Sequence, residues 1–269
     1  MGLVLENDVW ILKSDSSWTT VYEVDFAAEG AASEWSPASH GDTRTFNGVQ
    51  WTYGDSDPAN SSARGVNSSG MYITPTGGNL ATSTVSATRF LCYLDKNTSP
   101  LYPNASYQQV FAFQAIIQSS TDVSADTDAY GIILLDDVNS QHVQARRMYN
   151  ADAYGAADKG YSTYAYWTAG SATAHTTDGT QMTQFELVLL NGSVYGSVTG
   201  TGTTFVDPMT TDDWRETTNT QIVRGISPSA FVLDKDELAF MFWAFRADTS
   251  TTAFTPTMVK FRLLSMGKE

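Results

Sequence analysis

The chain has a single cysteine, Cys92, and only three histidines, so it is poor in the residues that disulfides and transition-metal sites require. No disulfide can form within the chain, and neither a His-x-x-x-His nor a Cys-x-x-Cys spacing occurs. Cys92 lies in the apolar run Arg89–Leu94, where a buried, unreactive thiol is the ordinary outcome. A zinc or iron site is therefore disfavoured.

Charge is also scarce, and positive charge most of all. Charged residues make up 16% of the chain, against about 25% in an average protein. The 15 Lys and Arg residues are outnumbered by 29 Asp and Glu, which gives a net charge of -14, and only Arg146 and Arg147 are adjacent. Binding to phosphate groups needs clustered basic residues, so we expect neither nucleic acid nor an anionic membrane as a partner.

Long hydrophobic runs are missing as well. The longest, Leu238–Phe245, is far shorter than the ~20 residues of a membrane-spanning helix. The first residues, Met1–Asp8, lack the basic patch and the roughly 7 to 15 apolar residues of a signal peptide. We expect no signal peptide and no membrane insertion, and a protein made in the cytoplasm of its host.

Strand-like segments fill most of the chain, whereas helical periodicity is almost absent. The polar stretches Asp55–Ser69 and Thr199–Thr220 are predicted to be long surface loops. The predicted strands are Thr20–Phe26, Gly48–Tyr53, Gly70–Thr74, Arg89–Leu94, Gln108–Ile117, Ala129–Leu135, His142–Tyr149, Tyr161–Trp167, Gln184–Leu190, Ser193–Thr199, Ala230–Leu233, Leu238–Phe245 and Thr257–Leu264.

Two local patterns refine this assignment. Asn191-Gly192 separates two apolar runs and accepts the positive φ angles of a type I′ turn, so it predicts a β-hairpin. The runs that begin at Gln108, Ala129, Gln184 and Leu238 are apolar at consecutive positions, which is typical of central strands covered on both faces.

About a dozen strands without intervening helices predict an all-β fold, a two-sheet antiparallel jelly-roll sandwich. We expect one sandwich domain at 18–269. Residues 1–17 form either an N-terminal arm or an extra edge strand, because they are rich in apolar side chains that need something to pack against. The candidate residues of such an assembly arm are Leu3, Leu5, Trp10, Ile11 and Leu12.

The order of strands resembles that of concanavalin-like (laminin-G-like) jelly rolls across residues 20–266. The resemblance rests on an early Val21–Phe26, a middle Gly131–Leu135 with an acidic turn after it, the hairpin Phe185–Tyr195 and a closing Met258–Leu264. It implies a sugar-binding module, a glycan hydrolase or lyase, or a structural domain of a virus particle. The polar, lysine-poor composition looks most like a bacteriophage virion protein.

One segment is similar to a catalytic motif of laminarinase-type hydrolases, Glu-x-Asp-x-x-Glu. Glu23 and Asp25 match its first two carboxylates, but Ala28 stands where the third is required. Retaining hydrolysis needs a nucleophile and an acid whose carboxyl groups are about 5 to 5.5 Å apart, and with Ala28 at the third position the required acid is missing. We therefore interpret Glu23 and Asp25 as solvent-side residues at a strand start. A Ser/His/Asp triad needs only to meet in space, and the sequence leaves that possibility open.

Aromatic residues gather around one predicted strand. Aromatic rings stack on the apolar faces of sugars, which makes this group the candidate carbohydrate-binding platform. Alternation places its members on both faces of the strand, however, and cross-strand packing explains them equally well. The residues are Tyr161, Tyr164, Tyr166 and Trp167.

Calcium is the more plausible ion, since it takes hard oxygen ligands. Asp122, Asp126 and Asp128 could converge in one loop, as could Asp136, Asp137 and Asn139. Neither set has EF-hand spacing, and acidic turns are often simply solvated loop tips. No other cofactor is indicated.

Three functions follow in order of preference. The first is a non-enzymatic structural protein of a virus particle, such as a capsid decoration, fibre or tail appendage, located in the virion. It would contact other virion proteins and further copies of itself, with a cell-surface glycan as an additional partner. The second is a lectin-like carbohydrate-binding module. The third is a polysaccharide hydrolase or lyase, which the incomplete Glu-x-Asp motif weighs against.

Overall fold

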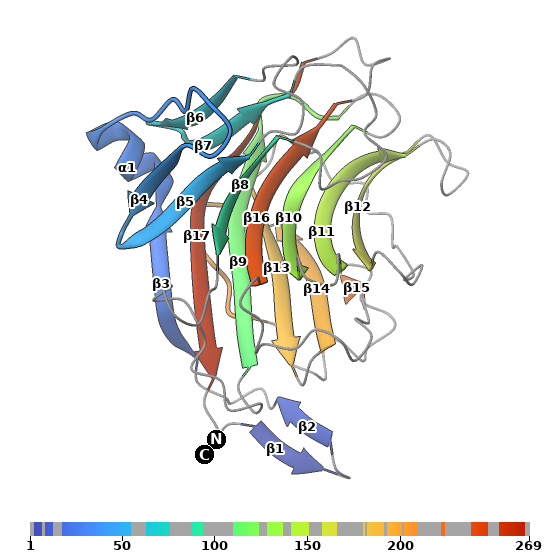
Figure 1. Ribbon diagram of the computed structural model, residues 1–269. Coiled ribbons are helices and arrows are strands. Elements are labelled where there is room, and N and C mark those ends of the chain that lie inside the picture. The colour runs from blue at the N-terminus through green and yellow to red at the C-terminus, as the bar shows by residue number, and fades with distance from the viewer. Residues whose placement is uncertain are drawn as a thin grey trace.

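The architecture is that of two antiparallel sheets stacked face to face (Figure 1). The computed structural model describes residues 3–6, 9–12, 18–54, 63–75, 88–93, 110–123, 128–136, 141–150, 158–165, 180, 182–190, 193–200, 202–208, 222–223, 238–246 and 253–266. Within these ranges no helix is long and apolar enough to cross a membrane. The predicted all-β, two-sheet antiparallel sandwich is confirmed.

One sheet has seven strands in the order β12-β11-β10-β16-β8-β5-β4. Four of them, β10, β11, β12 and β16, curve together along one side of the molecule (Figure 1). The strands are β4 (Thr43–Phe46), β5 (Val49–Gly54), β8 (Thr88–Tyr93), β10 (Ala129–Asp136), β11 (Gln141–Asn150), β12 (Asp158–Ala165) and β16 (Leu238–Phe245).

The other sheet has eight strands. Seven follow the order β15-β14-β13-β9-β17-β7-β6, and β3 pairs with β17 beside this path. The strands are β3 (Thr19–Asp25), β6 (Ala63–Asn67), β7 (Gly70–Thr74), β9 (Val110–Ser119), β13 (Thr183–Leu190), β14 (Ser193–Gly200), β15 (Ile222–Val223) and β17 (Pro256–Met266).

An aromatic core joins the two sheets. Phe240 of β16 and Phe261 of β17 come from opposite sheets, and their ring centroids are 4.3 Å apart. Trp51 of β5 packs edge-on against both rings, at 6.0 and 5.6 Å. Each such pair adds about 0.5–1.5 kcal/mol beyond the area it buries. Cys92 is fully buried in the same core, as predicted, and burial raises the pKa of its thiol.

The local strand predictions agree with this topology. The four strands predicted to be central, β9, β10, β13 and β16, each have a neighbour on both sides. In β13 and β14, Leu190 pairs with Ser193, which confirms the hairpin, although Asn191 and Gly192 lie outside the described residues. The predicted strand Ala230–Leu233 also lies outside them.

A short helix, α1 (Phe26–Ala32), follows β3 and was not predicted. Asp25 is its N-cap, and the Asp25 carboxylate accepts a hydrogen bond from the Ala28 amide at 3.0 Å. Phe26 turns into the core, with ring centroids 5.2 Å from Trp51. Asp25 therefore stands at the end of β3 and not at a strand start, and it organises the turn from strand to helix.

A polar network lies on the outer face of the eight-stranded sheet. The Gln114 amide donates to the buried Glu186 carboxylate, and its oxygen accepts from Nε of Arg262 at 2.6 Å. The Val206 carbonyl accepts from Gln114 at 3.1 Å and from Arg262 at 2.9 Å, so the segment 202–208 is fixed over this face. The Arg262 guanidinium also lies 4.5 Å from the centroid of the Phe205 ring. Burial lowers the pKa of Arg262, which nearby carboxylates oppose.

The N-terminal residues form a hairpin of β1 (Leu3–Glu6) and β2 (Val9–Leu12), which make a two-stranded sheet of their own. Its register pairs Leu3 with Leu12 and Leu5 with Trp10. Figure 1 shows this hairpin beyond one end of the two main sheets. The attachment role of residues 1–17, and the domain boundary after them, stay predictions.

Candidate functional site

The outer face of the eight-stranded sheet is hollowed where β7, β17 and β9 run side by side. Alternation along β7 buries Met71 and Ile73 in the core and leaves Tyr72 and Thr74 on the outer face, half-buried. Thr257 of β17 pairs with Tyr72 on one side and with Gln118 of β9 on the other. Three polar side chains therefore form a row across three adjacent strands.

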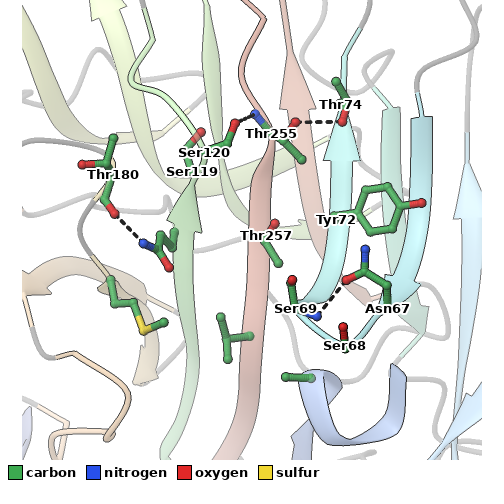
Figure 2. A pocket seen from close by; sticks show the side chains of 14 residues that line it. Asn67, Ser68, Ser69, Tyr72, Thr74, Ser119, Ser120, Thr180, Thr255 and Thr257 are labelled. Carbon is green, nitrogen blue, oxygen red and sulfur yellow. Dashed lines mark hydrogen bonds between the residues drawn. The ribbon is translucent and has the colours of Figure 1, made fainter. Parts of the chain in front are cut away.

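This row is the floor of a groove of about 840 Å³, a volume in the upper part of the ~300–1,000 Å³ typical of small-ligand sites. Figure 2 shows Thr257 in the middle, Tyr72 and Asn67 on one side and Thr180 on the other. The described residues that line the groove carry no charged side chain. They are Ala27, Asn67, Ser68, Ser69, Tyr72, Thr74, Gln118, Ser119, Ser120, Thr180, Met182, Thr255, Thr257 and Val259.

The wall beside Tyr72 is the tight turn between β6 and β7. The Asn67 side-chain oxygen accepts a hydrogen bond from the Ser69 amide at 2.8 Å, which closes the turn. Gly70 has a φ of 132°, and a Cβ there would stand 2.6 Å from the Met258 carbonyl oxygen. Only glycine therefore allows this turn to approach β17 so closely.

A second polar row lies two residues further along the same strands. The hydroxyls of Thr74 and Thr255 are 2.8 Å apart, and the Ser120 hydroxyl accepts from the Thr255 amide at 3.1 Å. The Gln118 amide donates to the Thr180 carbonyl at 2.8 Å, which ties the floor to the wall opposite Tyr72 (Figure 2). These bonds hold the side chains of Thr74, Ser120 and Gln118 in place.

Much of the hydrogen-bonding capacity of these residues is not used by the described part of the chain. There, the hydroxyls of Tyr72 and Thr257, the Asn67 side-chain nitrogen and the Gln118 side-chain oxygen have no protein partner. The Ser119 hydroxyl is buried and also has none. Both donors and acceptors are therefore available to a ligand.

Comparison with known proteins gives information on the fold. No protein-family model and no curated protein matches the sequence. Among solved structures, the chain is similar to a point mutant of the GH43 protein BlXynB from Bacillus licheniformis, with a TM-score of 0.54 and 10% identity. The match covers 97% of this chain and 45% of that one, so the chain spans less than half of that protein's length.

Two further structures have lower TM-scores. An endo-1,3-beta-glucanase from Streptomyces sioyaensis gives 0.49 at 9% identity and covers 95% of this chain and 99% of that one. The CBM2 module of the evolved Dit of Lactobacillus casei BL23 phage J-1 gives 0.47 at 8% identity, with 94% and 98% covered. The fold is a two-sheet jelly-roll sandwich. At these identities the likeness concerns the fold alone.

The aromatic platform predicted from the sequence is described in part. Tyr161 and Tyr164 lie in β12, at the edge of the seven-stranded sheet, where they pair with Arg147 and Gln144. Tyr166 and Trp167 lie outside the described residues. Tyr161 and Tyr164 thus share no strand with the groove, and the role of the platform in sugar binding stays a prediction.

The predicted calcium loop is described in part. Asp122 bonds to Arg147, whose Nε and Nη2 lie 3.0 and 2.6 Å from the two carboxylate oxygens. Asp128 is fully buried, and Asp126 lies outside the described residues. No group of three His, Cys, Asp or Glu residues that could hold a metal occurs in the part of the chain that the structure describes. Calcium binding stays a prediction.

Glu23 and Asp25, which match two positions of the hydrolase motif, both contact other residues of the fold. Asp25 caps α1 and lies 3.4 Å from the Lys260 ammonium group. Glu23 is exposed, and its carbonyl oxygen accepts from the Asn47 side chain at 2.8 Å. Sequence reasoning missed the groove, although Tyr72 and Thr74 alternate with apolar residues and could have identified a polar outer face of β7.

Proposed function

We propose that the protein is a non-catalytic carbohydrate-binding domain and that the groove over β7, β17 and β9 is its binding site. The observation that carries the proposal is the described lining of the groove, which combines hydroxyl and amide groups with one aromatic ring and has no charged side chain among its described residues. Sugars present hydroxyls that donate and accept together with apolar ring faces, and both features find a counterpart here.

The position of the groove on strands supports binding without large rearrangement. Three adjacent strands of one sheet hold Tyr72, Thr257 and Gln118 in register. Side chains on rigid elements lose little conformational entropy when a ligand binds, which raises affinity for a given set of contacts.

The same lining argues for binding and against turnover at this site. Hydrolysis of a glycosidic bond generally uses two Asp or Glu residues that flank it. None of the 14 described residues that line the groove is an acid, a histidine or a cysteine. We therefore propose that a glycan is held and released unchanged.

The test is glycan binding by calorimetry with a pair of tyrosine variants. We expect Tyr72→Ala to lower the affinity roughly tenfold, because a stacking contact is worth about 0.5–1.5 kcal/mol in addition to its buried area. Tyr93→Ala is the matched control, since Tyr93 is 45% exposed and lies on the other sheet. Circular dichroism checks that both variants fold. Equal affinities of the two variants, or no binding by the parent chain, would contradict the proposal.

A second pair removes one hydroxyl at constant shape. Thr257→Val deletes a hydroxyl in the middle of the groove, while Thr45→Val deletes an exposed one in β4 of the other sheet. We expect only the first to weaken binding, by roughly fivefold, which corresponds to about 1 kcal/mol for one hydrogen bond.

We further propose that this domain works as a bacteriophage virion appendage, as the composition indicates. The specific observation that favours it is the β1–β2 hairpin, a separate two-stranded sheet beyond one end of the sandwich. Deletion of residues 1–17 should leave the jelly roll folded and abolish its incorporation into the particle. Light scattering on both chains measures self-association, and normal incorporation of the shortened chain would contradict the attachment role.

A further inference from the structure

The groove also indicates which class of glycan it binds. We infer that its ligand is a neutral oligosaccharide of two or more sugar units and that acidic glycans are excluded. This inference rests on the proposed function, because it specifies the substrate class of the same site.

The first step concerns hydrogen-bond complementarity. A sugar hydroxyl both donates and accepts, as do the hydroxyls of Tyr72, Thr257 and Ser68 in the groove. A carboxylate or sulfate group only accepts, and it is bound well by Arg or Lys, neither of which occurs among the described residues of the groove lining. The Gln118 side-chain nitrogen is already bonded to the Thr180 carbonyl, so the group that Gln118 offers to a ligand is its side-chain oxygen. This oxygen is an acceptor and would repel an anion.

The second step concerns charge around the groove. Lys260 follows the lining residue Val259 in sequence, and its ammonium group lies 3.4 Å from the Asp25 carboxylate, so its positive charge is offset by a negative one. The whole chain carries a net charge of -14. An acidic polymer would therefore approach a repulsive field, and the described residues of the site offer no cation that compensates for it.

The third step concerns size. Neighbouring strands are about 4.8 Å apart, so the row from Tyr72 through Thr257 to Gln118 spans about 10 Å. The second row, from Thr74 to Ser120, lies two residues along the strands, or about 7 Å away. A surface of this extent exceeds one sugar ring, so affinity should rise from a monosaccharide to its di- and trisaccharide.

The experiment compares polymers that differ only in charge. Methyl-esterified and de-esterified polygalacturonate form one such pair, and β-1,4-mannan and β-1,4-polymannuronate form another. We expect the intact protein to bind at least one neutral member and to bind its acidic counterpart at least about tenfold more weakly. Binding of the neutral member should change less than about twofold between roughly 0.05 and 0.5 M NaCl, because no ion pair is screened.

A charge-gain variant tests the same reasoning in the opposite direction. Ser68→Lys adds a cation at the exposed rim of the groove, whereas Thr45→Lys adds the same charge to β4 of the other sheet. Only Ser68→Lys should gain affinity for the acidic polymer, and that gain should disappear at high salt.

The outcomes separate the two levels of the proposal. Stronger binding of an acidic polymer than of its neutral counterpart by the parent chain would overturn the neutral-glycan inference while leaving carbohydrate binding in place. Equal gains in Ser68→Lys and Thr45→Lys would likewise overturn it, because the effect would not belong to the groove. No binding to any polymer would overturn the proposed function and, with it, this inference.

Discussion

The network around Gln114 allows a quantitative prediction about stability. Gln114, Glu186 and Arg262 stand side by side in one row across β9, β13 and β17. Gln114→Leu keeps a side chain of similar volume and leaves the backbone pairing of β9 unchanged. It removes the side-chain hydrogen bonds to Glu186, to Arg262 and to the Val206 carbonyl. Two of these bonds involve charged groups, worth about 1.5–3 kcal/mol each, and the third is worth about 1 kcal/mol. Since leucine recovers some apolar burial, we expect a net loss of about 3–5 kcal/mol.

Urea unfolding followed by tryptophan fluorescence measures this loss. For a domain of this size, about 3–5 kcal/mol corresponds to a decrease in melting temperature of roughly 6–20 °C. The matched control is Gln50→Leu on β5, where the glutamine is exposed and we expect a change within about 0.5 kcal/mol. Similar unfolding midpoints for the two variants would refute the reasoning, since the hydrogen bonds of Gln114 would then add no more to the free energy of unfolding than the exposed Gln50 does.

Three further predictions concern single groups. Burial raises the pKa of the Cys92 thiol. The contribution of the neutral thiol to the free energy of unfolding is therefore fully present below the ordinary pKa of about 8.5 and is lost as the pH rises. The free energy of unfolding should then fall by up to ~1.4 kcal/mol per pH unit between about pH 8.5 and 10, a slope that Cys92→Ala should remove in titrations of the urea midpoint. Asp122→Ala removes the partner of Arg147, which is 1% exposed, and should cost about 3 kcal/mol. By contrast, Asp207→Ala should change little in the same thermal assay, because Asp207 is 89% exposed and 3.8 Å from its partner. Asp25→Ala removes the cap of α1 and should cost about 1 kcal/mol in thermal unfolding; no change would show that the cap is dispensable.

Strands could be predicted from the sequence because their signal is local. Consecutive apolar residues in β9, β10, β13 and β16 indicated strands covered on both faces, and each of them is central in its sheet. Asn191-Gly192 indicated a hairpin for the same reason, since a two-residue turn depends only on its own φ angles. In each case the deciding information lies within about ten residues of chain.

The helix α1 and the strand β6 were not predicted, for a related reason. α1 has seven residues, fewer than two complete turns beyond its cap, so no apolar periodicity could develop. β6 has only five residues and lies in a stretch predicted to be a surface loop. Its position is set by pairing with β7 and by the isolated bridge from Trp35 to Val66, which are contacts that local composition does not show.

The groove could not be predicted because it is assembled from distant segments. Thr74 and Thr255 share a hydrogen bond across 181 positions of sequence. Their meeting depends on β17, the last strand of the chain, entering the sheet between β7 and β9. Neither threonine is unusual in its own segment, so only the strand order reveals that they form one surface.

The same strand order separates binding from stability along β9. Gln114 and Gln118 share the outer face, but they are four residues apart, which is about 13 Å in an extended strand. Gln114 holds the buried network, whereas Gln118 belongs to the floor of the groove. Gln114→Leu should therefore lower the melting temperature without changing glycan affinity at about 25 °C, where most of the chain remains folded. Gln118→Leu should do the reverse, weakening binding roughly fivefold with little effect on unfolding, since it loses one bond to Thr180 and a contact with the ligand. Parallel losses of affinity and stability in both variants would mean that the groove is only part of the packing of the sheet.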